Sequence, residues 1–207
     1  AEVTASYLQL PQEYIFFGNG AADVLFRLAL ALKPGRALLL APTFADYEKA
    51  LRTVDCKISY YNLQEARDFA ADNDIVDAIT PDTDLVVICN PNNPTGYLYT
   101  RREMNQIRDL VKKYDLFLFS DEVYREFIYT GSPYISACHL EGIENNVVLI
   151  DSVSKRYSEC GIRIGALITK NKEIRDAVMK FCQARLSPPL IGQIAAEASL
   201  DADEDYL

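Results

Sequence analysis

The chain has 207 residues, of which 49% are hydrophobic and 25% are charged, and its formal net charge is −9. This composition is that of an ordinary globular protein and excludes a disordered, collagen-like or low-complexity chain. The acidic balance argues against a nucleic-acid partner and against an anionic membrane surface, because both attract basic protein faces. The length fits one large domain that needs no disulfide or metal staple.

Short apolar runs alternate with helical patterns along most of the chain. Seven runs are expected to be strands: residues 14–17, 37–41, 57–61, 85–89, 116–120, 147–150 and 164–168. Several of them are continuous runs of Val, Leu, Ile and Phe, which are typical of strands covered on both faces. The order of strands and helices therefore predicts an α/β fold with three αβα layers and a mostly parallel, seven-stranded sheet.

Two stripes of apolar residues at helical spacing predict amphipathic helices. The first covers residues 24–32 and ends before Pro34-Gly35. The second covers residues 104–114, and Thr100 with Glu103 forms a capping box at its start. Helix-like stretches also begin and end the chain, at residues 1–10 and 192–207. No repeat or linker interrupts the pattern, so we expect a single domain over residues 1–207.

The cysteines show no pairing or metal-ligand pattern, and there is one histidine, His139. The five are Cys56, Cys89, Cys138, Cys160 and Cys182. Because they are scattered and odd in number, we expect reduced thiols, a cytoplasmic protein and no metal site. The sequence shows no signal-peptide pattern, and no apolar run approaches the roughly 20 residues of a membrane span, so we expect a soluble protein.

Ligands of open α/β sheets bind at the carboxyl ends of the strands, so the polar residues there are candidates for a site. Gly18-Asn19-Gly20-Ala21-Ala22-Asp23 follows the first strand and opens a helix, where free backbone N–H groups favour an anion. Taken alone, this segment is as often a plain tight turn. It lacks the G-x-G-x-x-G spacing and a Walker lysine, which weakens a dinucleotide or triphosphate interpretation.

Three further polar segments follow later strands. Asn90-Pro91-Asn92-Asn93-Pro94-Thr95-Gly96 follows the fourth strand, and Asp121-Glu122-Val123-Tyr124 follows the fifth. Asp151-Ser152-Val153-Ser154-Lys155 follows the sixth, and Arg163 comes eight residues after the lysine. Each segment has an ordinary structural interpretation by itself: a rigid turn, a helix cap and a surface lysine.

Together and in this order, the four segments resemble the large domain of fold-type I pyridoxal-phosphate enzymes of the class I/II aminotransferases. The resemblance covers essentially the whole chain. The first half, with Phe16-Phe17-Gly18-Asn19-Gly20 and Pro42-Thr43-Phe44-Ala45-Asp46-Tyr47, is most similar to the threonine-phosphate decarboxylase and histidinol-phosphate aminotransferase branch. The second half, from Ser154-Lys155-Arg156-Tyr157-Ser158 to Leu186-Ser187-Pro188-Pro189, resembles the aspartate aminotransferase branch more.

The resemblance implies roles for individual residues. Lys155 would form an imine with the aldehyde of pyridoxal 5'-phosphate and, once freed, move the substrate's α-proton. Asp121 would pair with the pyridinium nitrogen, and Tyr124 with Asn93 would hydrogen-bond the 3' oxygen of the ring. Phe44 would stack on one ring face. The catalytic candidates are therefore Lys155, Asp121 and Tyr124.

The resemblance also implies a phosphate site built from backbone N–H groups, two hydroxyls and one guanidinium, which suits the bidentate geometry of phosphate. Its residues are Gly20, Ala21, Ala22, Ser152, Ser154 and Arg163. Since positions 21 and 22 are alanines, that turn offers only backbone donors.

Residues 1–207 correspond to the family's large domain only. The family's N-terminal segment and its small C-terminal domain, which carries an arginine for the substrate carboxylate, are expected to be absent. Arg175 and Arg185 do not stand at that position and are expected to be surface residues. The resulting open, wet site predicts slow turnover with poor discrimination among amino acids.

The functional expectation is a pyridoxal-phosphate-dependent transaminase acting on an amino acid and a 2-oxo acid. Two alternatives stay open: decarboxylation of an O-phosphorylated amino acid, and a non-catalytic truncated or engineered scaffold. A nucleotide-binding Rossmann domain ranks last. Small molecules are the expected partners, without nucleic acid or membrane. Apolar surface left by truncation favours self-association, and a homodimer is one state open to it.

Overall fold

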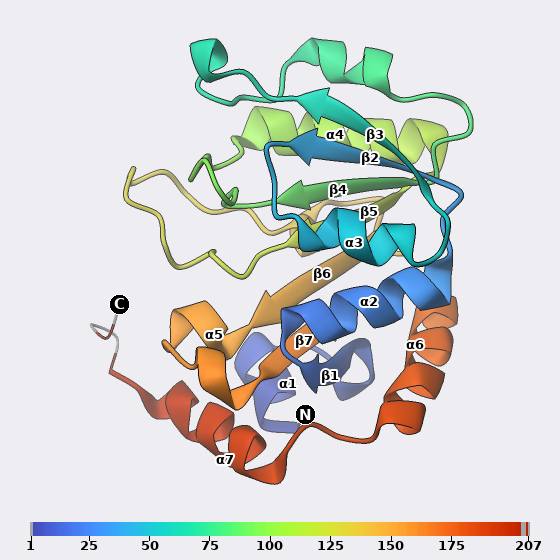
Figure 1. Ribbon diagram of the computed structural model, residues 1–207. Coiled ribbons are helices and arrows are strands. Elements are labelled where there is room, and N and C mark those ends of the chain that lie inside the picture. The colour runs from blue at the N-terminus through green and yellow to red at the C-terminus, as the bar shows by residue number, and fades with distance from the viewer. Residues whose placement is uncertain (1, 204–205, 207) are drawn as a thin grey trace.

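The computed structural model describes residues 2–203 and 206, and these form one sheet covered by helices (Figure 1). The strands are β1 (Ile15–Asn19), β2 (Arg36–Ala41), β3 (Lys57–Asn62), β4 (Leu85–Cys89), β5 (Phe117–Asp121), β6 (Val147–Ser152) and β7 (Ile164–Ile168). The α-helices are α1 (Glu2–Leu8), α2 (Ala21–Leu32), α3 (Asp46–Arg52), α4 (Arg101–Tyr114), α5 (Val153–Arg156), α6 (Lys172–Arg185) and α7 (Leu190–Ala198). Short 3-10 helices are η1 (Gln12–Tyr14), η2 (Glu65–Arg67), η3 (Asn73–Ala78), η4 (Ala137–His139), η5 (Cys160–Ile162) and η6 (Ser199–Asp201).

The sheet has seven strands in the order β1-β7-β6-β5-β4-β2-β3. Neighbours pair in parallel except around β7, which is antiparallel to both β1 and β6. Each of the seven expected strands is present, with bounds within two residues of those predicted. The predicted α/β fold with a mostly parallel sheet is therefore confirmed.

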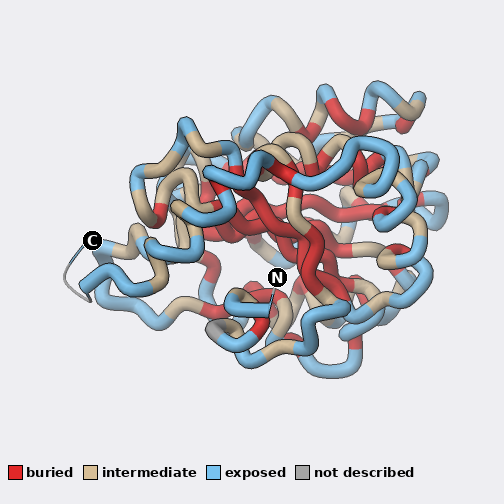
Figure 2. Tube along the Cα trace, turned by 90° about the horizontal axis from the view of Figure 1, so that it is seen from below, coloured by how far each residue is buried: buried red, intermediate tan, exposed pale blue. Residues whose placement is uncertain are grey.

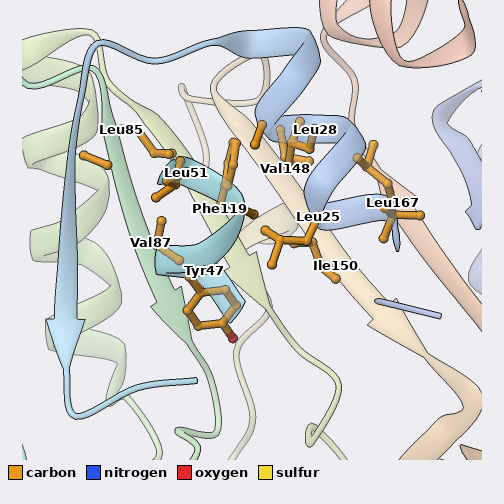
Figure 3. Close-up of a cluster of buried hydrophobic side chains, with 14 of the residues drawn as sticks. Leu25, Leu28, Tyr47, Leu51, Leu85, Val87, Phe119, Val148, Ile150 and Leu167 are labelled. Atoms are coloured by element: carbon orange, nitrogen blue, oxygen red, sulfur yellow. The ribbon is translucent and has the colours of Figure 1, made fainter. Parts of the chain in front are cut away.

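Alternate residues of the strands belong to two apolar layers, one on each face of the sheet. On the first face, Leu39, Val87 and Phe119 pack against residues of α2, α3 and α6 such as Leu25 and Leu51 (Figure 3). On the second face, strand residues pack against α4 and the 3-10 segments. Figure 2 shows the buried strands running through the centre of the molecule under an exposed outer layer. This double burial explains why the strands read as continuous apolar runs.

The ends of the two predicted amphipathic helices follow from local chemistry. The hydroxyl of Thr100 accepts the N–H of Glu103 at 3.3 Å, and the Glu103 carboxylate accepts the N–H of Thr100 at 2.8 Å, so the predicted capping box is confirmed. Helix α2 ends at Leu32, and Lys33 follows in the left-handed region with φ +46°.

The two terminal helices differ from the expectation in their bounds. The C-terminal helix was expected over residues 192–207, but α7 starts at Leu190, directly after Pro189, and ends at Ala198. Positions 1, 204, 205 and 207 of the two expected terminal helices lie outside the described residues. No bounds were predicted for α3, α5 and α6, and α5, with only four residues, is too short to show an apolar stripe. None of the helices formed by residues 2–203 combines the length and the apolar character that crossing a membrane requires.

Candidate functional site

A pocket of about 360 Å³ lies where the carboxyl ends of β4, β5 and β6 meet the start of α2. All of the site residues expected from the sequence except Gly20 line it: Ala21, Ala22, Phe44, Asn93, Asp121, Tyr124, Ser152, Ser154, Lys155 and Arg163. They come together because parallel neighbours end at the same edge of the sheet. The arrowheads of β4 and β6 point to this edge in Figure 1.

Two glycines allow the start of α2 to lie close to its neighbours, because they have no side chain. Gly20 has φ +86°, and a Cβ there would lie 2.2 Å from Nη2 of Arg163. A Cβ on Gly165 of β7 would lie 2.3 Å from the backbone nitrogen of Ala21. Gly20 therefore contributes to the site by admitting the guanidinium rather than by lining the pocket. The first N–H groups of α2 and the guanidinium together suit an anion.

Arg163 and two serines complete this anion cradle. The Arg163 guanidinium donates to the carbonyl oxygens of Cys160 at 2.7 Å and Asn19 at 3.3 Å, which fixes its position. The Ser152 hydroxyl donates to the carbonyl of Ile164 at 2.9 Å and accepts the N–H of Ser154 at 3.1 Å. The two serine oxygens lie 2.8 Å apart.

Asp121 brings a buried carboxylate to the same pocket. The Tyr47 hydroxyl donates to its Oδ2 at 2.7 Å, and the Val123 N–H donates to its Oδ1 at 3.2 Å. Burial raises the pKa of Asp121 to about 6; the two hydrogen bonds oppose this shift, and the nearby Asp151 carboxylate adds to it. The pKa of Tyr47 is also raised, first by its own burial and then by Asp121. Asp121 therefore titrates close to the physiological range.

Lys155 and two aromatic rings stand beside these groups. Lys155 lies on α5, and its Nζ is 5.8 Å from the centroid of the Tyr124 ring. The Phe44 ring is 37% exposed and meets the Tyr47 ring edge-on, with centroids 5.6 Å apart. The pocket thus combines an amine, a buried carboxylate, aromatic surface and anion donors. This set suits a planar molecule that carries a phosphate and a basic ring atom.

Four charged residues form a closed ring of ion pairs next to the pocket, which we call the charge ring: Arg125, Glu126, Asp151 and Arg156. Nη2 of Arg156 lies 3.0 Å from Oδ1 of Asp151, and Nη2 of Arg125 lies 3.3 Å from Oδ2. The Nε atoms of Arg156 and Arg125 lie 3.0 and 3.2 Å from Oε1 of Glu126. Three members neighbour pocket residues in sequence, so the charge ring ties together the segments that carry Tyr124, Ser152 and Lys155.

The pocket also contains residues that the sequence did not single out: Asp46, Tyr47, Cys89, Val123 and Cys160. Cys89 ends β4, so the rule that sites form at strand ends points to it. Burial raises the pKa of its thiol to about 12, which keeps it neutral. Tyr47 stands three residues after Phe44 on α3, but no sequence signal shows its contact with Asp121.

The two arginines of α6 lie away from the pocket, as expected. Neither Arg175 nor Arg185 lines this pocket. Arg185 is exposed, as expected, and its Nε lies 3.6 Å from Oδ1 of Asp23. Arg175 was expected at the surface as well, but it is half-buried and its guanidinium lies 4.9 Å from the centroid of the Tyr14 ring. Arg175 is therefore at the surface but partly covered by the aromatic face.

Comparisons with known proteins give one family. The family model described as aminotransferase class I and II matches residues 2–207. The threonine-phosphate decarboxylase of Salmonella typhimurium is 32% identical over 206 residues, which are 99% of this chain and 54% of that protein. The histidinol-phosphate aminotransferase of Rubrobacter xylanophilus is 31% identical over 192 residues, which are 92% of this chain and 53% of that protein.

The solved structures give the same fold. The aromatic aminotransferase of Pyrococcus horikoshii OT3 superposes with a TM-score of 0.91 at 28% sequence identity. The match covers 99% of this chain and 57% of that structure. The chain therefore spans about half the length of the relatives it matches.

Proposed function

The chain belongs to the aminotransferase class I and II family, and on that premise we propose that it binds its cofactor in the pocket around Lys155 and transfers amino groups. The cofactor of this family is pyridoxal 5'-phosphate. The proposed reaction moves an amino group from an amino acid to a 2-oxo acid. It is a proposal because the chain spans about half of its relatives' length.

The residues present fit this cofactor, and their meeting in one pocket is the observation that carries the proposal. The volume of about 360 Å³ is in the range of small-molecule sites. The N–H groups at the start of α2, Ser152, Ser154 and Arg163 are hydrogen-bond donors that suit a phosphate. The missing side chain of Gly20 leaves the space in which the Arg163 guanidinium lies. The buried Asp121 suits a protonated ring nitrogen, whose positive charge it would neutralise.

Bound pyridoxal phosphate supplies an aldehyde for covalent attachment and a ring that withdraws electrons from the substrate's α-carbon. The Nζ of Lys155 would provide the attachment point and would move the substrate's α-proton as general base. Asp121, as a carboxylate, would keep the ring nitrogen protonated. Tyr124 and Asn93 would bind the ring oxygen, and Phe44 would cover one ring face and exclude water from it.

Covalent attachment at Lys155 tests the proposal directly. We expect an absorbance band in the visible range on adding pyridoxal phosphate, and borohydride reduction should place one adduct on Lys155 in peptide mass maps. Lys155→Ala should lose the band and the adduct, whereas Lys172→Ala should keep both, because Lys172 is exposed and pairs with Asp176 away from the pocket. Adducts spread over surface lysines in the unsubstituted protein would contradict the proposal.

A second candidate reaction is decarboxylation of an O-phosphorylated amino acid. It is favoured by the 32% identity to a threonine-phosphate decarboxylase across 99% of this chain. Carbon dioxide release without keto-acid formation would support decarboxylation, and keto-acid formation would support transamination. An adduct at Lys155 without product in either assay would support the non-catalytic alternative.

We also propose that the chain self-associates through α7. Leu190, Ile191 and Ile194 are 70%, 82% and 60% exposed, an unusual cluster for a surface helix. Sedimentation velocity should show a concentration-dependent dimer that Ile191→Glu disperses. A monomer at all concentrations would contradict this.

A further inference from the structure

We infer that Tyr47 is a positioning residue for Asp121, whose carboxylate it holds toward the pocket in the ionised form. The inference deepens the proposed function and rests on it for its catalytic meaning. The two residues are 74 positions apart in sequence, and the Tyr47 hydroxyl donates to Oδ2 of Asp121 at 2.7 Å. Both side chains are almost fully buried, at 1% and 8% exposure.

The Tyr47 ring cannot readily move away from this contact. It belongs to the apolar cluster between α2, α3 and the sheet, and it meets the Phe44 ring edge-on. Figure 3 shows the ring at the edge of that cluster with its hydroxyl oxygen pointing away from the other side chains. A donor fixed in this way orients the carboxylate, because one oxygen is bound by Tyr47 and the other by the Val123 N–H.

The groups around Asp121 show why a hydroxyl is needed there. Cys89 on β4 stays a neutral thiol, because burial raises its pKa to about 12, so it places no charge of its own beside Asp121. Asp151 on β6 raises the pKa of Asp121. Lys155 and Tyr124 line the same pocket.

Burial makes the largest contribution to the pKa of Asp121, and it acts in the same direction as Asp151. The hydrogen bonds from Tyr47 and from the Val123 N–H act against both and lower the pKa, with the Tyr47 bond the larger of the two. Without the hydroxyl, Asp121 would become protonated closer to neutral pH. A neutral acid would then face the ring nitrogen in place of a carboxylate.

Titration of Asp121 in the cofactor-free protein measures this effect without any activity. With ¹³C-carboxyl-labelled aspartate, and with Asp121→Asn to assign the signal, we expect a midpoint near pH 6 in the unsubstituted protein. Tyr47→Phe keeps the ring and should raise the midpoint by about one pH unit or more. Tyr99→Phe is the matched control: Tyr99 is equally buried, and its hydroxyl has no hydrogen-bond partner among the residues that the structure describes.

The possible outcomes separate the inference from the proposed function. An unchanged midpoint in Tyr47→Phe overturns the inference, whether or not an adduct forms at Lys155. Failure of the unsubstituted protein to form that adduct contradicts the proposed function and leaves the titration result standing. If Tyr47→Phe does not fold, 3-fluorotyrosine at position 47 carries the test. It is a stronger donor and should lower the midpoint, and an unchanged midpoint overturns the inference.

Discussion

Two consecutive buried carboxylates, Asp121 at the end of β5 and Glu122 directly after it, face opposite sides of the sheet, as neighbours in an extended chain do. Glu122, on the side of η4, is fully buried and accepts three hydrogen bonds. Its donors are the hydroxyl of Ser120 at 2.9 Å, the N–H of Ala137 at 2.8 Å and the hydroxyl of Tyr134. Asp121, on the side of the pocket, has the two donors described above.

The difference separates a structural acid from one available for chemistry. Burial raises the pKa of both carboxyl groups. The acceptor sites of Glu122 are used to hold the segment that contains Tyr134 and Ala137 against the sheet. Asp121 borders the pocket, so part of its acceptor capacity is left for a ligand. A buried acid with few partners costs folding free energy, a cost that active sites commonly carry.

The largest expected effect is on the structural side. Glu122→Ala removes the acceptor of three donors inside the protein, which should lower the free energy of unfolding by about 4 kcal/mol. Urea denaturation of the cofactor-free protein measures this change. A loss below about 1 kcal/mol would show that Glu122 does not hold its segment, and the comparison would fail.

Substitution on the pocket side should have the opposite sign. The pKa of Asp121 is about 6 in the folded protein and near 3.8 when unfolded, so the ionised form destabilises the fold. The resulting loss in the free energy of unfolding is absent below about pH 4 and grows between about pH 4 and 6. Above about pH 6 it reaches its full value of roughly 3 kcal/mol. Asp121→Asn should therefore stabilise the cofactor-free protein by up to about 3 kcal/mol at pH 8.

At pH 4 the same variant should differ little from the unsubstituted protein, because Asp121 is then protonated in the folded state. Denaturation curves at both pH values test this dependence. The gain in stability of Asp121→Asn over the unsubstituted protein should be larger at pH 8 than at pH 4. A smaller gain at pH 8 would refute the statement that ionised Asp121 destabilises the fold.

The smallest expected effect sharpens the comparison. Ser120→Ala removes one of the three donors to Glu122 and should cost about 1 kcal/mol in the free energy of unfolding. The adduct at Lys155 should form as in the unsubstituted protein, since Ser120 does not line the pocket. Loss of cofactor binding without loss of stability would mean that the two sides of β5 are not independent.

Much of this arrangement could be predicted from the sequence. Continuous apolar runs such as residues 85–89 mark the strands, and the order of strands and helices predicts the layers. Parallel strands end at one edge, so the polar residues that follow them, among them Asn93, Asp121, Ser152 and Lys155, are expected to meet there. Assigning the strands is enough to predict these positions, because each residue directly follows the end of its own strand.

Contacts between distant segments could not be predicted in the same way. Tyr47 meets Asp121 across 74 residues, and apolar spacing on the seven-residue α3 shows only that the ring is buried. Arginine usually lies at the surface, so the sequence does not show that Arg125 and Arg156 are paired. Only the folded sheet brings both to Asp151. The sequence likewise does not reveal the three donors of Glu122, two of which, Tyr134 and Ala137, lie 12 and 15 residues after it.

The charge ring limits how this part of the protein can evolve. Asp151 and Arg156 are buried, and each of the four charges is paired with two others, so replacing any single corner leaves a buried charge without one of its partners. Lineages that alter one corner are expected to change another soon afterwards. Arg125, Glu126, Asp151 and Arg156 should therefore be inherited as a set, and related sequences should carry either all four or a jointly altered combination.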